Sequence, residues 1–122
     1  MTKKIMVIDD EPDTIEAIDT VLEMEGYEGH TFTDAKKALA ELQKGLRPDL
    51  ILLDMRMPQI SGPDFCTLLR KNPKLVKLRV CFFTASNDLN KGLLKKHGAL
   101  GFVYKPFNIS ELVEQIEKYS SM

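Results

Sequence analysis

Short runs of apolar side chains, each ended by a polar residue, restrict the fold of this 122-residue sequence more than any other feature. They are too short for buried helices and rich in branched and aromatic residues, so each predicts a strand buried on both faces of a sheet. Four such runs occur, at residues 5–8, 50–53, 80–83 and 102–104. A fifth run, 27–32, is more polar and carries a glycine, which favours an edge strand beside the first.

Between these runs the apolar residues recur every three or four positions, which is the spacing of helices that face a sheet. The stripes are Ile15, Ile18 and Leu22; Ala35, Ala38, Leu39 and Leu42; Phe65, Leu68 and Leu69; Leu89, Leu93 and Leu94; and Leu112, Ile116 and Tyr119. Gly26, Gly45 and Gly98 each follow a stripe, where glycine commonly closes a helix. This alternation predicts an α/β fold with a parallel sheet covered by helices on both faces.

Charge and cysteine content narrow the class of protein. Seventeen Lys and Arg against 18 Asp and Glu give a formal net charge of −1, which indicates neither nucleic acid nor an anionic membrane as a partner. Only two cysteines are present, and Cys81 lies inside an apolar run, which argues against a disulfide framework. The first apolar run is too short for a signal peptide or a membrane span. We therefore expect a single cytoplasmic domain over residues 1–122.

Polar residues collect where the predicted strands end: Asp9 and Asp10 follow the first strand, Asp54 the third, Thr84 the fourth and Lys105 the fifth. In a parallel sheet these ends share one edge, which is where open α/β sheets bind ligands. Two carboxylates about 4 Å apart repel by roughly 4 kcal/mol at an effective dielectric near 20. Hard oxygen ligands favour Mg²⁺, with Mn²⁺ as an alternative, so a metal site is predicted at this edge.

A cation beside a carboxylate favours phosphoryl transfer, in which Asp54 attacks in line while the metal and Lys105 neutralise the equatorial oxygens. The Thr84 hydroxyl is then placed to bond a phosphoryl oxygen. Each residue alone also has a plainer role. Asp9 and Asp10 suit a helix cap, Asp54 a turn, Thr84 a strand-end hydroxyl and Lys105 a solvated surface position. Only the joint arrangement favours the phosphoryl-transfer site.

In order and spacing, these motifs resemble the receiver domains of two-component response regulators over residues 5–119. The matching motifs are Asp9-Asp10-Glu11-Pro12, Leu53-Asp54 with Met57-Pro58 and Ser61-Gly62, Phe83-Thr84-Ala85, and Gly98-Ala99 before Lys105-Pro106-Phe107. The resemblance implies a flavodoxin-like (βα)5 three-layer sandwich with a five-stranded parallel sheet in the order 2-1-3-4-5. It also implies a cis peptide bond between Lys105 and Pro106.

The same resemblance implies a role for each polar residue at the sheet edge. Asp54 is the phosphoacceptor, Asp10 is a direct metal ligand, and Asp9 acts more through water. Thr84 and Lys105 hold the phosphoryl group.

Three further positions carry expectations from the family. The backbone carbonyl of Arg56 completes the protein's metal ligands, and both Arg56 and Ser86 occupy positions that tune the lifetime of the phosphate. Phe102 stands where the family has its switch aromatic. An edge-strand aromatic packed half into the core is an equally good interpretation of Phe102.

The family implies a phosphorelay in which a histidine kinase or phosphotransfer protein donates to Asp54. A downstream target is then expected to bind around the fourth helix, fifth strand and fifth helix. No direct contact with nucleic acid or membrane is expected. The domain is also not expected to be a multiple-turnover enzyme. Two alternatives stay open: a Mg-dependent aspartate-nucleophile phosphatase, and a receiver-like interaction module that is not phosphorylated. Arg56 opposes the phosphatase, because such enzymes typically carry a second aspartate there.

Overall fold

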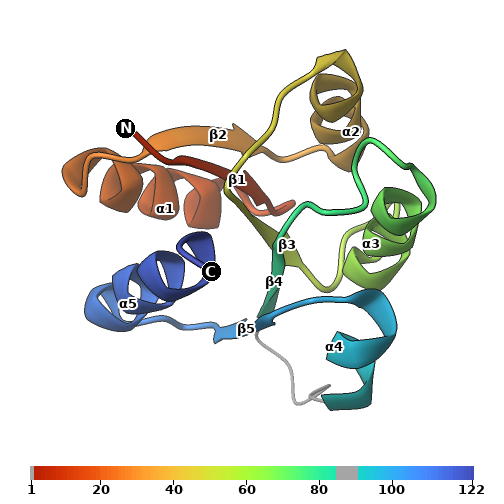
Figure 1. The fold of residues 1–122 in the computed structure, drawn as a ribbon. Helices are drawn as coiled ribbons and strands as arrows, with labels where there is room; N and C mark the ends of the chain where they lie inside the picture. The colour runs from red at the N-terminus through yellow and green to blue at the C-terminus, as the bar shows by residue number, and fades with distance from the viewer. Residues whose placement is uncertain (1, 85–90) are drawn as a thin grey trace.

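The computed structural model describes residues 2–84 and 91–122, so the expectations for Ser86 and Leu89 lie outside the described residues, as does that for the Leu93 side chain. Strands and helices alternate along the chain (Figure 1). The strands are β1 (Lys4–Ile8), β2 (Glu28–Phe32), β3 (Leu50–Asp54), β4 (Val80–Thr84) and β5 (Gly101–Tyr104). The helices are α1 (Pro12–Met24), α2 (Ala35–Lys44), α3 (Gly62–Lys71), α4 (Lys91–His97) and α5 (Ile109–Ser120).

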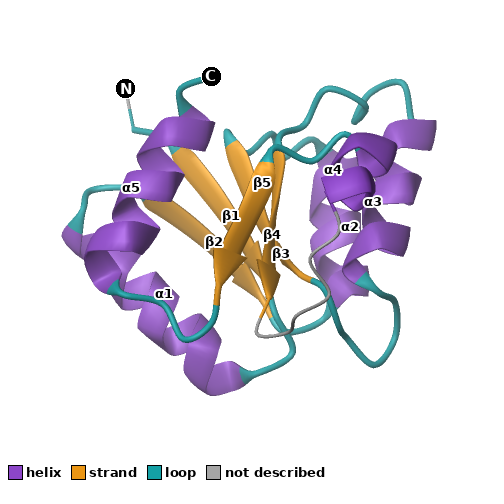
Figure 2. Cartoon of the chain, turned by 90° about the horizontal axis from the view of Figure 1, so that it is seen from below, coloured by secondary structure: helices purple, strands orange, loops and turns teal. Residues whose placement is uncertain are grey.

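The five strands form one parallel sheet in the order β2-β1-β3-β4-β5. Helices α1 and α5 cover one face, and α2, α3 and α4 cover the other (Figure 2). The predicted flavodoxin-like three-layer sandwich is therefore confirmed.

Each face of the sheet has its own apolar core, because successive side chains of a strand point to opposite faces. On β1, Met6 belongs to the core beneath α2 and α3, whereas Val7 belongs to the core beneath α1 and α5. Strands β1, β3 and β4 are buried on both faces as predicted. The prediction is wrong for β5, an edge strand whose Tyr104 is 54% exposed.

Helices α1, α2 and α4 end close to the glycines that the sequence predicted as stop signals. One residue predicted to lie in the core is exposed instead. Gly26, Gly45 and Gly98 all have positive φ, the conformation in which glycine closes a helix without strain. Leu68 on α3 is 42% exposed, because it lines a surface hollow shared with α2 instead of facing the sheet. No helix in the described ranges combines the length and apolar character needed to cross a membrane.

Candidate metal centre

The acidic residues meet because β1 and β3 are adjacent strands. Ile8 pairs with Leu53, so the next residue of each strand, Asp9 and Asp54, stands at the same carboxyl edge of the sheet. Asp9, Asp10 and Asp54 each offer a carboxylate oxygen, and these atoms all lie within 4.8 Å of one another. Asp9 is fully buried and Asp54 is 6% exposed, so solvent screens the repulsion between them only weakly.

Backbone contacts hold this edge in place. Asp9 Oδ1 accepts a hydrogen bond from the Glu11 N–H at 2.9 Å, so this carboxylate fixes the loop before α1. The N-cap of α1 is Glu11, which makes no side-chain cap bond, so Asp9 and Asp10 do not act as its N-cap. At the other side, a Cβ on Gly62 would run into the Asp54 carbonyl oxygen, so only glycine lets α3 begin this close to β3.

Lys105 brings a positive charge from the end of β5. Its Nζ lies 2.5 Å from Asp9 Oδ2, 3.7 Å from Asp54 Oδ2 and 3.5 Å from Glu11 Oε1. The expected cis peptide bond joins Lys105 to Pro106. Sequence reasoning did not include Glu11 in the site. Its position directly after Asp9 and Asp10 was the available signal.

The pKa values at this edge reflect burial and crowding. Burial, followed by the charge of Asp9, raises the pKa of Asp54 to about 7, although Lys105 and the Arg56 N–H act in the opposite direction. Burial works against the Lys105 ammonium, but its contact with Asp9 and the charges of Asp54 and Glu11 outweigh that cost and raise its pKa. Additional positive charge at the edge would therefore stabilise ionised Asp54.

The donor set fits a divalent cation. Asp9 Oδ2 is buried, and Lys105 Nζ lies 2.5 Å from it, so this oxygen already faces a positive charge at the edge. Asp10 is only partly buried, which leaves room for water in the coordination shell. Carboxylates with space for water are the arrangement that Mg²⁺ uses in proteins.

The remaining predicted residues lie at different depths, and not all of them contact the acids. Thr84 ends β4 with 2% exposure, and its carbonyl accepts a hydrogen bond from the Lys105 N–H at 2.8 Å. The Arg56 N–H lies 3.4 Å from Asp54 Oδ1. Phe102 is half-buried and packs against Phe82, with ring centroids 6.0 Å apart, on the side of the sheet that α2, α3 and α4 cover. Phe102 therefore contacts the core.

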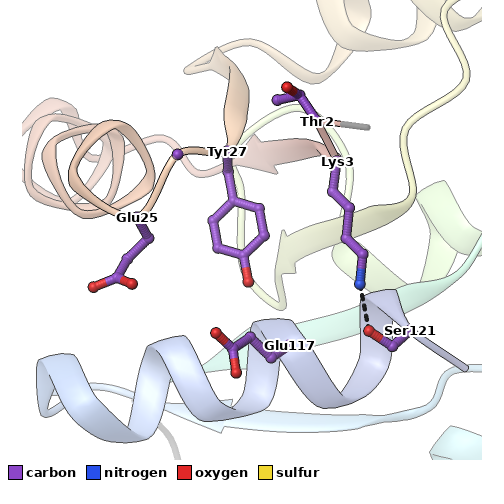
Figure 3. A pocket seen from close by; sticks show the side chains of 7 residues that line it. Thr2, Lys3, Glu25, Tyr27, Glu117 and Ser121 are labelled. Atoms are coloured by element: carbon purple, nitrogen blue, oxygen red, sulfur yellow. Dashed lines mark hydrogen bonds between the residues drawn. The ribbon is translucent and has the colours of Figure 1, made fainter.

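The opposite rim of the sheet carries a pocket of about 570 Å³ (Figure 3). Its lining includes Thr2, Lys3, Glu25, Tyr27, Glu117 and Ser121. Lys3 Nζ donates a hydrogen bond to Ser121 Oγ, and burial followed by the charges of Glu117 and Glu25 raises the pKa of Tyr27. Within residues 2–84 and 91–122, only the group at the carboxyl edge brings three potential metal-ligating side chains together.

Comparison with known proteins agrees with this geometry. The family model for the response regulator receiver domain matches residues 5–117. The DNA-binding response regulator MtrA of Mycolicibacterium smegmatis is 35% identical over 116 residues, covering 95% of this chain and 50% of MtrA. The chain thus spans about half the length of the curated relatives it matches.

Solved structures give the same result. Chemotaxis protein CheY4 of Vibrio cholerae matches with a TM-score of 0.90 and 28% identity, covering 98% of this chain and 99% of CheY4. Response regulator protein TrrA of Thermotoga maritima, solved in complex with Mg²⁺–BeF, matches with a TM-score of 0.83 and 35% identity, covering 97% of this chain and 99% of TrrA. The chain therefore belongs to the family of response regulator receiver domains.

Proposed function

We propose that this receiver domain takes a phosphoryl group onto Asp54 in a reaction that needs Mg²⁺ or Mn²⁺. One observation carries the proposal: the carboxylates of Asp9, Asp10 and Asp54 lie within 4.8 Å of one another, with Lys105 Nζ 3.7 Å from Asp54. Residues 1–122 act as one unit in this proposal. Each phosphorylation is a single signalling event, so the domain is not a multiple-turnover enzyme.

Each residue at the edge has a defined task in the proposed transfer. Asp10, Asp54 and the Arg56 carbonyl would hold the metal, and Asp9 would act through water. A bound Mg²⁺ supplies positive charge to the phosphoryl oxygens. An Asp54 carboxylate oxygen attacks phosphorus in line, and the bond from phosphorus to the donor's leaving atom breaks as the new bond forms.

Two further residues receive the transferred group. The Lys105 ammonium leaves Asp9 to contact one phosphoryl oxygen, and the Thr84 hydroxyl donates a hydrogen bond to another. Movement of Thr84 draws Phe102 inward and changes the surface of α4, β5 and α5, where a downstream target binds. Partial burial of Phe102 supports this, because a side chain that switches must leave its packing at small cost.

The proposed donor is a phosphorylated histidine on a cytoplasmic kinase or phosphotransfer protein. A groove of about 530 Å³ beside Lys105 supports a protein donor. It runs between α1 and the segment before α5, and Ala17, Pro106 and Phe107 give it an apolar lining. An amphipathic partner helix fits such a groove. Because relatives such as MtrA are named DNA-binding regulators, control of transcription is one candidate output for a protein carrying this domain.

Labelling with a small phosphodonor tests the proposed function. The protein is incubated with acetyl phosphate, with and without Mg²⁺, and its intact mass is measured. We expect one phosphoryl adduct per chain with Mg²⁺, and none with EDTA or in Asp54→Asn. Absence of any adduct in the wild type would overturn the proposal. Continuous hydrolysis of a phosphate ester would instead indicate the aspartate phosphatase.

A further inference from the structure

Glu11 is a charged residue at this edge that the proposed transfer does not use. Its carboxylate lies 3.5 Å from Lys105 Nζ, yet its side chain is 64% exposed. Its backbone is held on both sides, because its N–H donates to Asp9 Oδ1 at 2.9 Å and its carbonyl accepts from the Ile15 N–H at 3.1 Å. Glu11 also lines the groove beside Lys105. A fixed backbone therefore keeps a negative charge at the mouth of the site.

Glu11 is far more exposed than the other two carboxylates that contact Lys105. The side chains of Asp9 and Asp54 are 1% and 9% exposed. With a divalent cation bound, the charges of Asp9, Asp10, Asp54 and Lys105 balance to zero. Glu11 then leaves one net negative charge on these five residues, and that charge sits on the most exposed of the carboxylates that contact Lys105.

We propose that Glu11 determines which phosphodonors reach Asp54, by slowing small anionic donors in proportion to their negative charge. A partner protein avoids this penalty when its docking surface places a positive charge opposite Glu11. The inference rests on the proposed function, and Glu11 acts on the approach of the donor without joining the transfer. The bond changes at phosphorus stay the same for every donor, and the donor's leaving group departs with the bonding electron pair.

Two donors of different charge test the proposal. Labelling rates are measured with acetyl phosphate as a dianion and phosphoramidate as a monoanion, at low ionic strength and at Mg²⁺ concentrations that saturate each variant. We expect Glu11→Gln to label roughly five- to tenfold faster with the dianion and roughly two- to threefold faster with the monoanion. Both gains shrink in high salt because ions screen the exposed charge.

Control variants separate this effect from general changes in charge or structure. Glu16→Gln removes the same charge from an exposed position on α1 outside the groove, so it should label within about twofold of the wild type. Glu11→Asp should keep most of the wild-type discrimination between donors. Thermal unfolding of each variant checks that the fold is intact.

Three outcomes would overturn the proposal. Unchanged labelling in Glu11→Gln would show that this carboxylate does not affect donor approach. Equal gains with both donors, insensitive to salt, would show that Glu11 only restrains Lys105. A wild type that is not labelled by either donor would remove the proposed function and this inference together, whereas the first two results leave the proposed function standing.

Discussion

The two rims of the sheet carry similar side chains in very different settings. At the carboxyl rim, the buried acids Asp9 and Asp54 both lie within 4 Å of Lys105. At the amino rim, Glu25 and Glu117 are exposed in an open pocket, where the Lys3 ammonium bonds to a serine hydroxyl (Figure 3). Both rims therefore offer carboxylates and a lysine, but only the first forces them together away from water.

This contrast shows that burial, and not residue type alone, sets the electrostatics of the carboxyl rim. Desolvation is the largest cause of the raised pKa of Asp54, ahead of the charge of Asp9. Exposed charges such as Glu25 and Glu117 are screened by solvent and interact weakly. Substitutions at matched positions on the two rims should therefore have very different effects.

The largest expected effect is on stability without divalent ions. Asp54 has a pKa of about 7 in the folded chain, against 3.8 for an ordinary aspartate. The folded state therefore holds this proton more tightly, and the resulting stability is lost as pH rises from 3.8 through about 7. Relative to Asp54→Asn, the wild type should lose at most about 4 kcal/mol of unfolding free energy across this range.

Urea unfolding in EDTA, on both sides of that pH range, measures the loss. Glu117→Gln at the amino rim should retain the wild-type pH dependence. If the unfolding free energies of Asp54→Asn and the wild type change with pH in the same way, burial of ionised Asp54 does not destabilise the fold. The two rims would then not differ in the way described above.

Lysine substitutions should give the next largest effect. Lys105→Ala removes the ammonium that lies 3.7 Å from Asp54 Oδ2, so the labelling rate with acetyl phosphate and Mg²⁺ should fall about 10²-fold. Lys3→Ala removes the same charge from the amino rim and should leave the rate within about twofold. If both variants slow labelling equally, net charge rather than position controls the reaction.

The stabilisation that Mg²⁺ gives should also depend on which rim is altered, but this effect is smaller. At about ten times its dissociation constant, Mg²⁺ should stabilise the wild type by about 1.4 kcal/mol. Asp10→Asn should lose most of this gain because it removes a proposed ligand, whereas Glu25→Gln should keep it. Unfolding midpoints with and without Mg²⁺ give the comparison, and an undiminished gain in Asp10→Asn would exclude Asp10 as a ligand.

The smallest effect is expected at Phe102, which packs against Phe82 in the core. Phe102→Leu should change the labelling rate less than about twofold, because transfer depends on the rim residues and not on this ring. The same acetyl phosphate assay measures it. A tenfold loss would show that Phe102 supports the acids directly.

Local pattern was sufficient to predict most of the fold. Continuous apolar runs predict β1, β3 and β4 because a strand buried on both faces has no position for a polar side chain. Parallel strands end at one edge of a sheet, so the positions of Asp9, Asp54 and Lys105 at strand ends predicted that these residues would meet.

Features that depend on distant neighbours could not be predicted in the same way. Tyr104 is exposed because β5 lies at the sheet edge, and the composition of its own run does not encode that position. Leu68 follows the apolar stripe of α3 but lies where α2 and α3 leave a hollow. The contact of Glu11 with Lys105 depends on the conformation of the loop after β1, for which the sequence offered only proximity to two aspartates.

The proposed role of Asp54 can be checked by identifying the carboxylate that carries phosphorus after labelling. The wild type is labelled with acetyl phosphate and Mg²⁺, the acyl phosphate is reduced with borohydride, and peptide mass spectrometry locates the resulting homoserine. We expect homoserine at position 54 alone. Homoserine at position 9 or 10, or its absence from position 54 in a labelled chain, would show that Asp54 is not the sole phosphoacceptor.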